Sequence, residues 1–133
     1  MKRFLLPLSY GFGVWVIGTA LFVIAGNWVI PAAGTPLTVP VLVGLTVLTG
    51  GLVWLIGVDF RKRVGPAPAD RLALMAGLAG TGLLLDGLIL LVNGTYYPLM
   101  SADRQSSFAT YLLLGYGAAI GALLLPTGRA VDD

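Results

Sequence analysis

Four long apolar stretches, separated by short polar or turn-rich links, set the hydrophobic pattern of the chain. An α-helix of about 20 apolar residues is long enough to cross the hydrocarbon core of a bilayer, which is about 30 Å thick. The pattern therefore predicts an all-α fold, an integral membrane bundle of four transmembrane helices that forms a single domain. The predicted spans cover about residues 8–30, 37–58, 72–93 and 107–125 of the chain 1–133.

The composition agrees with this pattern and excludes several classes of function. Hydrophobic residues make up 57% of the chain and charged residues only 11%, whereas a soluble domain carries about 25% charged residues. The chain has no cysteine, no histidine and no glutamate, so the common metal ligands and the usual general base are missing. We therefore expect no metal, no cofactor and no enzymatic activity. The net charge of +2 is small and comes from the links, which argues against nucleic acid as a partner.

Lysine and arginine are distributed unevenly between the two sides of the predicted bundle. Seven of the eight precede the first span or lie in the 59–71 link and the tail, whereas Arg104 lies on the other side. Basic residues in short links stay in the cytoplasm, so we expect both termini and the 59–71 link to be cytoplasmic. A cleaved signal peptide is the alternative for the first stretch, but its apolar run exceeds the roughly 7–15 residues typical of a signal.

Arg61, Lys62 and Arg63 form the strongest positive cluster in the chain. Such a cluster beside a membrane span fixes the topology and attracts anionic lipid headgroups. We therefore expect these three side chains to contact lipid headgroups, with membrane lipids as the main partners of the protein. A specific lipid site or a protein partner is the alternative interpretation of the cluster.

Small residues recur at helical spacing in each predicted span. In the third span Ala76 and Gly80 are four residues apart and Gly87 follows Asp86 by one, and in the fourth span Gly117 and Gly121 form a GxxxG pair. Lipid provides no hydrophobic drive between helices, so small side chains stabilise a bundle by letting the backbones approach. We expect these four glycines to serve helix packing within the bundle. The alternative is that the same stripe also joins a homo-oligomer.

Asp86 is the only formal charge in the third stretch. An aspartate at the centre of a membrane helix costs about 2.5–3.5 kcal/mol on insertion scales. Its position about 10 Å before Asn93 places it in the outer half of the membrane, with Asn93 on the same helical face. Tyr111 and Tyr116 of the fourth span lie at matching depth, and no other span contains a lysine, arginine or histidine. Asp86, Asn93, Tyr111 and Tyr116 are therefore the predicted ligand or proton site.

Four interpretations of Asp86 stay open. It can tie the third helix to the fourth through a hydrogen bond, respond to protons or a cation, anchor a ligand, or take part in catalysis. Desolvation disfavours the charged form, so a protonated Asp86 bonded to a tyrosine is one expectation. Catalysis has the least support, because a lone aspartate without a histidine, a cysteine or a metal set makes a poor active site.

Several short motifs resemble a family of uncharacterised four-helix bacterial membrane proteins. They are GFGVWVIGTALF in the first span, LLLDGLILL in the third, YYPLM after it, and FATYLLLGYGAAI in the fourth. Members of that family share an aspartate in the third helix, followed by a turn of an aromatic residue, proline, any residue and methionine. The family has asparagine after the proline, where this chain has Leu99. The resemblance implies the fold, the topology and the inner membrane of a bacterium, but no activity.

The small multidrug transporters also have four helices and a similar length, but they need a glutamate embedded in the first helix. The first span here contains no acid, which argues against membership of that group.

Two hypotheses of function follow from these residues. In the first, a small bundle binds or moves a small lipophilic or cationic solute, or senses protons, through a polar pocket centred on Asp86. In the second, the protein is a non-catalytic accessory or structural subunit of a membrane assembly, and Asp86 only locks two helices together. A pocket lined by Asp86, Asn93, Tyr111 and Tyr116 favours the first hypothesis, and dense packing around Asp86 favours the second.

Overall fold

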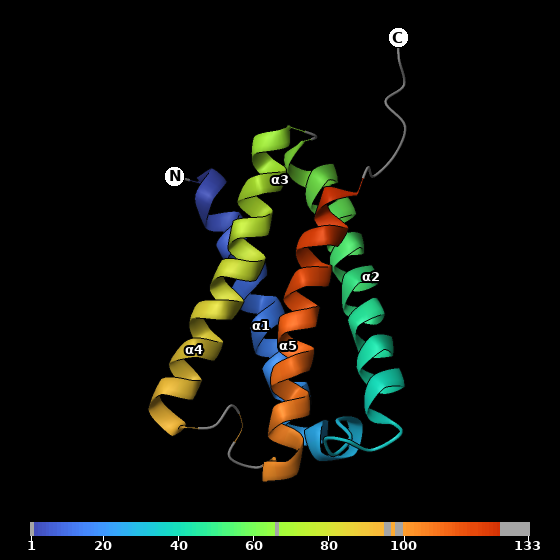
Figure 1. Ribbon diagram of the computed structural model, residues 1–133. Helices are drawn as coiled ribbons and strands as arrows, with labels where there is room; N and C mark the ends of the chain where they lie inside the picture. The colour runs from blue at the N-terminus through green and yellow to red at the C-terminus, as the bar shows by residue number, and fades with distance from the viewer. Residues whose placement is uncertain (1, 66, 95–96, 98–99, 126–133) are drawn as a thin grey trace.

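The computed structural model describes residues 2–65, 67–94, 97 and 100–125, with side chains from residue 5 onward. Every regular element in these ranges is helical, and none of the described residues lies in a β-strand. Tyr96, Pro98 and Leu99 of the predicted aromatic turn, like Arg129, fall outside the described residues. The elements are α1 (Lys2–Val29), α2 (Thr38–Val64), α3 (Pro68–Met75), the π-helix η1 (Ala76–Gly80), α4 (Thr81–Asn93) and α5 (Ala102–Leu124) (Figure 1).

Four helical rods are long and apolar enough to cross a membrane, which confirms the predicted number of spans. These rods are α1, α2, the continuous α3–η1–α4 rod and α5. The helices extend beyond the predicted apolar stretches, most clearly in α2, which continues to Val64 through residues expected in a link. Charged residues extend a helix when they pair one turn apart, as Asp59 and Arg63 do. Gly65, with φ of 124°, then ends α2 in a conformation that favours glycine.

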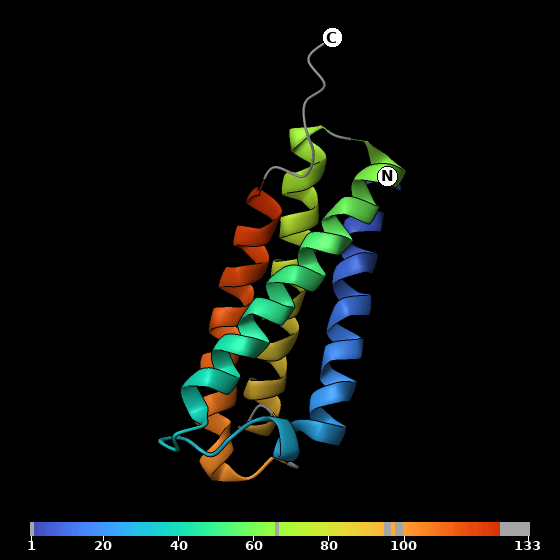
Figure 2. The ribbon, with the colours of Figure 1, turned by 90° about the vertical axis from the view of Figure 1, so that its right-hand side faces the viewer.

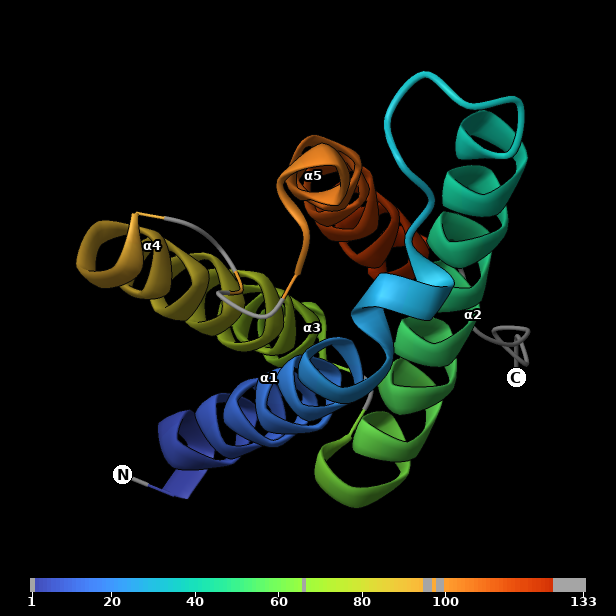
Figure 3. The same cartoon turned by 90° about the horizontal axis from the view of Figure 1, so that it is seen from below.

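The four rods pack mainly as two pairs. One pair is α2 with α5, and the other is α1 with the α3–η1–α4 rod (Figures 2 and 3). The two pairs meet where α2 and α5 reach α3 and η1, toward the end that holds Arg61, Lys62, Arg63 and Arg71, here named the basic end. At the opposite end α4 diverges from α5 (Figure 1). The bundle is therefore tightly joined at one end and open between α4 and α5 at the other.

The closest approach in the bundle is the crossing of α1 over η1. A Cβ added at Gly77 would lie 2.6 Å from the carbonyl carbon of Pro7, and one at Gly11 would lie 2.7 Å from that of Gly77. Both distances are shorter than real Cβ contacts, so only glycine fits at either position. Backbone packs directly on backbone here, as is common where small residues line a membrane-helix interface.

The four glycines predicted to serve helix packing do not line any close helix contact within this chain. A Cβ added at any of them would meet nothing within 4 Å in the described part of the molecule. On the third rod, Gly87 follows the buried Asp86 by one residue and Gly80 precedes the buried Gly82 by two, so neither lies on the buried line of that rod. The four positions are Gly80, Gly87, Gly117 and Gly121.

The π-helix keeps one line of residues on the buried face of the third rod. Leu74, Leu78, Gly82 and Asp86 are spaced four apart and are all buried. In a pure α-helix each step of four residues drifts by about 40°, so the line would turn away from the core. One wider turn of the π type offsets most of that drift. Asp86 therefore faces the interior of the bundle because η1 precedes it.

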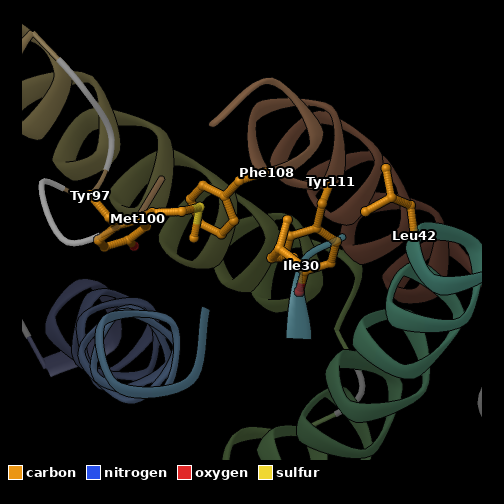
Figure 4. Packing of buried hydrophobic residues seen from close by; sticks show 6 residues of the cluster. All are labelled: Ile30, Leu42, Tyr97, Met100, Phe108 and Tyr111. Carbon is orange, nitrogen blue, oxygen red and sulfur yellow. The ribbon is translucent and has the colours of Figure 1, made fainter. Parts of the chain in front are cut away.

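Two separate cores fill the bundle. The basic-end core packs α2 against α3, η1 and α5, and its buried members are Val53, Phe60, Leu74, Leu78, Ala119 and Leu123. The aromatic-end core lies at the opposite end and takes part of its members from the links (Figure 4). Its buried members are Ile30, Leu42, Tyr97, Met100, Phe108 and Tyr111.

Hydrogen bonds hold the links at the aromatic end in place. Arg104 donates from Nη1 to the carbonyl oxygen of Ile30, whose side chain is fully buried. Gln105 donates from Nε2 to the carbonyl oxygens of Tyr97, at 2.7 Å, and of Met100, at 3.1 Å. These bonds satisfy backbone groups that irregular segments would otherwise leave unpaired. The aromatic end thus depends on polar side chains of α5 as well as on apolar packing.

Candidate functional site

A cavity of about 130 Å³ lies between the two cores. All four rods contribute to its wall, and most of the wall is apolar or glycine. The basic-end core borders it through Val53, and the aromatic-end core through Tyr111. The polar side chains in the wall include Thr19, Thr49, Asp86, Tyr97, Tyr111 and Tyr116.

Asp86 is the acidic group of this cavity. Its side chain comes from α4, and the residue is only 6% exposed. One carboxylate oxygen accepts a hydrogen bond of 2.9 Å from the indole Nε1–H of Trp15 on α1. The other accepts a hydrogen bond from the hydroxyl of Tyr116 on α5. Asp86 therefore joins three helices, and it links the two helix pairs across the gap where α4 leaves α5.

Gly82 provides the space for the ring of Tyr116. A Cβ added at Gly82 would lie 2.5 Å from the Tyr116 hydroxyl oxygen and 2.8 Å from its Cε1. Gly82 is one helical turn before Asp86, so both lie on the same face of α4. Because Gly82 has no side chain, the phenol of Tyr116 can come close to α4 and reach the carboxylate.

Tyr111 lines the cavity but bonds to a different partner from the one expected. Its hydroxyl shares a hydrogen bond of 2.8 Å with the hydroxyl of Thr49 on α2. Tyr97 similarly donates to Thr19 Oγ1 on α1 at 3.4 Å. Burial raises the pKa of the Tyr97 phenol above its ordinary value, so this hydroxyl stays a protonated donor at physiological pH. These two pairs supply hydroxyl groups, and no formal charge, to the cavity wall.

Asn93 does not line the cavity, contrary to the prediction. It is the last residue of α4 and is exposed. Asn93 does follow Asp86 by two helical turns, but α4 has diverged from α5 at that point (Figure 1). The same helical face therefore turns toward the surroundings instead of toward a neighbouring helix.

The three residues of the basic cluster differ in their surroundings. Lys62 and Arg63 are exposed, and Arg63 Nε pairs with Asp59 at 2.8 Å. Tyr10 of α1 donates from its hydroxyl to the same Asp59 oxygen, also at 2.8 Å. Arg61 is half-buried and borders a small hollow that Arg71 also lines. Lys62 and Arg63 thus lie on the surface of the bundle, and their contact with lipid headgroups stays a prediction.

Sequence reasoning missed two residues that build the site, Trp15 and Gly82. A usable signal exists for Trp15, because Gly11 and Gly18 flank it at four and three residues and share its helical face. That face is the one turned to the third rod and the cavity. For Gly82, the spacing of four residues from Asp86 is the only signal in the sequence.

The arrangement favours binding chemistry. Within the described residues, no three acidic, histidine or cysteine side chains lie close enough together to hold a metal ion. The cavity offers one carboxylate, several hydroxyls and a largely apolar wall. No protein-family model, curated protein or solved structure matches the chain.

Proposed function

We propose that this small multi-pass membrane protein binds a small lipophilic or cationic solute in the cavity at Asp86. The observation that carries the proposal is a carboxylate buried in the wall of a cavity inside a bundle of apolar helices. Intramembrane acids are costly and are functional candidates by default. Dense packing around Asp86 would have favoured a purely structural role, and the cavity argues for the binding role.

The size and the wall of the cavity support a small, mostly apolar guest. An engineered protein cavity of about 150 Å³ lined by aliphatic and aromatic groups takes up benzene, and the present cavity measures about 130 Å³. Small-molecule sites are generally apolar, with a few polar groups that fix the orientation of the ligand. Asp86 and the hydroxyls of Thr49 and Tyr111 match that description. Movement of the solute across the membrane and proton sensing are further predictions that build on this binding step.

The proposal includes an orientation in the inner membrane of a bacterium. The N-terminal end of α1 lies at the basic end, together with Arg61, Lys62, Arg63 and Arg71 (Figure 1). The positive-inside rule then favours a cytoplasmic basic end and cytoplasmic termini. A single cysteine introduced at Lys62 should react with a membrane-impermeant maleimide only after the cells are opened. A single cysteine introduced at Asn93 should react in intact cells, and the reverse pattern would overturn the orientation.

The binding proposal is tested by filling the cavity. Gly18 lines the cavity, and a Cβ added there would meet nothing within 4 Å. Gly18→Leu should therefore occupy the space without a clash. Gly13 is on the same helix, is equally open and does not line the cavity, so Gly13→Leu is the matched control. The readout is the thermal shift of the purified protein with a panel of small neutral and cationic lipophilic compounds.

The expected result is that some compounds raise the melting temperature of the wild type and of Gly13→Leu, but not that of Gly18→Leu. A ligand that binds only the folded state stabilises it by mass action, so loss of the shift reports loss of the site. A panel that shifts none of the three proteins, or all three equally, would overturn the proposal.

A structural role is the second candidate, and one observation favours it. Asp86 holds α1 and α5 together through Trp15 and Tyr116, which is what a helix-locking residue does. In that case the cavity is a packing defect, and Gly18→Leu should stabilise the protein by filling it. Stabilisation of Gly18→Leu, combined with a panel that shifts no variant, would favour the accessory-subunit hypothesis.

A further inference from the structure

We infer that the cavity at Asp86 recognises an N-methylated ammonium group, with the carboxylate as counterion and the surrounding aromatic rings as the cage. The inference rests on the proposed function, and it names the chemical class of the solute. Two features carry it: the absence of a cationic side chain at the cavity, and the aromatic wall.

Asp86 has no cationic partner at the cavity among the residues that the structure describes. Among the described residues, no lysine or arginine lines the cavity. Arg61, Lys62, Arg63 and Arg71 lie at the basic end, beyond the basic-end core. Arg104 lies at the aromatic end and donates to the Ile30 carbonyl. The two donors that reach Asp86, an indole and a phenol, are neutral, so neither supplies a positive charge. A cationic guest would supply the missing charge.

Aromatic side chains make up a large part of the wall. They come from α1, from the link before α5 and from α5 itself, and the rings of Phe22 and Tyr111 lie 5.2 Å apart. The face of an aromatic ring attracts a cation within about 6 Å of its centre, and cages of such rings bind methylated ammonium groups. The aromatic residues that line the cavity are Trp15, Phe22, Tyr97, Tyr111 and Tyr116.

The cavity offers a single carboxylate and otherwise hydroxyl groups, so the choice among cations falls to the aromatic wall. A metal ion such as Ca²⁺ takes about six to eight oxygen ligands, and a primary ammonium has three N–H donors to satisfy. Here the hydroxyls of Thr49 and Tyr111 bond each other, and Tyr97 donates to Thr19. Asp86 keeps unused lone pairs, since a carboxylate has about four acceptor sites and two are taken. An ammonium whose protons are replaced by methyl groups needs charge neutralisation but few hydrogen bonds.

The test compares two guests of equal size on the wild-type protein. Tetramethylammonium and tert-butanol are compact molecules with the same number of heavy atoms, and only the first is charged. Both are titrated by calorimetry into protein in a non-ionic detergent, with chloride salt held constant and empty micelles subtracted. We expect tetramethylammonium to bind at least about tenfold more tightly, because both the carboxylate and the rings favour the cation.

Two variants test which side chains cause the preference for the charged guest. Asn at position 86 keeps the shape of the side chain, can accept from Trp15 and can donate to the Tyr116 oxygen, so Asp86→Asn should fold. It should lower the affinity for tetramethylammonium about tenfold and leave that for tert-butanol within about threefold. Phe22→Leu should lower the affinity for tetramethylammonium about threefold without changing that for tert-butanol.

The outcomes separate the inference from the proposed function. Equal binding of both guests, or tighter binding of tert-butanol, would overturn the ammonium cage and leave a binding cavity for neutral solutes. Tighter binding of methylammonium than of tetramethylammonium would also overturn it, because hydrogen bonding would then outweigh the aromatic wall. Binding of neither guest would remove the support for the cavity as a binding site altogether.

Discussion

The third rod meets its neighbours in two different ways on the two sides of Gly80. In η1, Gly77 packs its backbone directly against the backbone of α1 near Pro7 and Gly11. In α4, Asp86 reaches α1 and α5 only through hydrogen-bonded side chains, beside a cavity. The first contact leaves no room for any side chain atom. The second leaves space that a solute can occupy.

This difference shows how one continuous rod can be fixed against a neighbour in one part and line a cavity in another. Backbone contact fixes the position of η1 because it offers no alternative arrangement of side chains. Side-chain contact allows the side chains of α4 to change rotamer. Breaking such a contact costs little free energy, because a hydrogen bond between membrane helices contributes about 0.6 kcal/mol on average. The variants below separate the two contacts, from the largest expected effect to the smallest.

Gly77→Val should have the largest effect, because its side chain would overlap the Pro7 backbone. A Cβ at this position already lies 2.6 Å from the Pro7 carbonyl carbon. Backbone cannot yield as a side chain can, so we expect a loss of about 3 kcal/mol or more, or failure to fold. The measurement is unfolding of the purified protein by a denaturing detergent. Gly80→Val, where a Cβ meets nothing within 4 Å, is the control, and equal losses in both variants would contradict the tight crossing.

Asp86→Leu should have the next largest effect. It would leave the indole N–H of Trp15 and the hydroxyl of Tyr116 without their acceptor in a buried site. Leaving buried donors unpaired costs about 1–3 kcal/mol. Asp86→Asn, which can keep both hydrogen bonds, should lose less than about 1 kcal/mol in the same unfolding assay. A larger loss for Asn than for Leu would show that the bridge to α1 and α5 is not what the carboxylate contributes.

Gly82→Ala should have a smaller effect, because a side chain can move where backbone cannot. The added methyl group would lie 2.5 Å from the Tyr116 hydroxyl oxygen and push the ring away from Asp86. We expect a loss of about 1 kcal/mol. Gly87→Ala lies on the same helix with open space around it and should be neutral or slightly stabilising. In a Tyr116→Phe background the loss from Gly82→Ala should shrink, and an unchanged loss would separate Gly82 from the Asp86 bond.

Arg104→Met should have the smallest measurable effect. The change keeps an unbranched side chain but removes the donor to the Ile30 carbonyl at the aromatic end. We expect a loss of about 0.5–1 kcal/mol, typical of one hydrogen bond. Arg63→Met is the comparison at the basic end, and it should leave stability nearly unchanged because its pair with Asp59 is exposed. A loss of stability in Arg63→Met, with none in Arg104→Met, would contradict the expected difference between the two ends.

The sequence was sufficient to predict the four helical spans and the pairing of Asp86 with a tyrosine of the fourth. Length and hydrophobicity predict the helical spans, because a helix must be long and apolar to cross a bilayer. Matching depth along two antiparallel helices predicts the pairing of Asp86 with a tyrosine, and Tyr116 is indeed a partner. Depth alone did not distinguish Tyr116 from Tyr111, which bonds Thr49 instead. The choice between them depends on the space at Gly82, which only the three-dimensional packing defines.

The glycine stripes and Asn93 show where helical periodicity fails. Counting residues at the α-helical period assumes a constant turn, and η1 breaks that assumption between Ala76 and Gly80. One wider turn shifts every later residue around the axis by a large fraction of about 100°. Gly80 and Gly87 were expected to serve helix packing, but they lie off the line of Gly82 and Asp86 that faces the interior. Asn93 was expected on the same face of α4 as Asp86, but near Asn93 α4 has already diverged from α5 (Figure 1).

The pairing of the rods has a consequence for how the protein is made. The ribosome makes α1 and α2 first, yet these two helices are not among the main helix pairs of the bundle, and Tyr10 joins them through Asp59 and Phe60. The main partner of α1 is the third rod, and that of α2 is α5. Each of the first two helices therefore finds its main partner only in the second half of the chain. Packing of this bundle is thus a late event in synthesis, and a chain that stalls after α2 would hold two helices without their main partners.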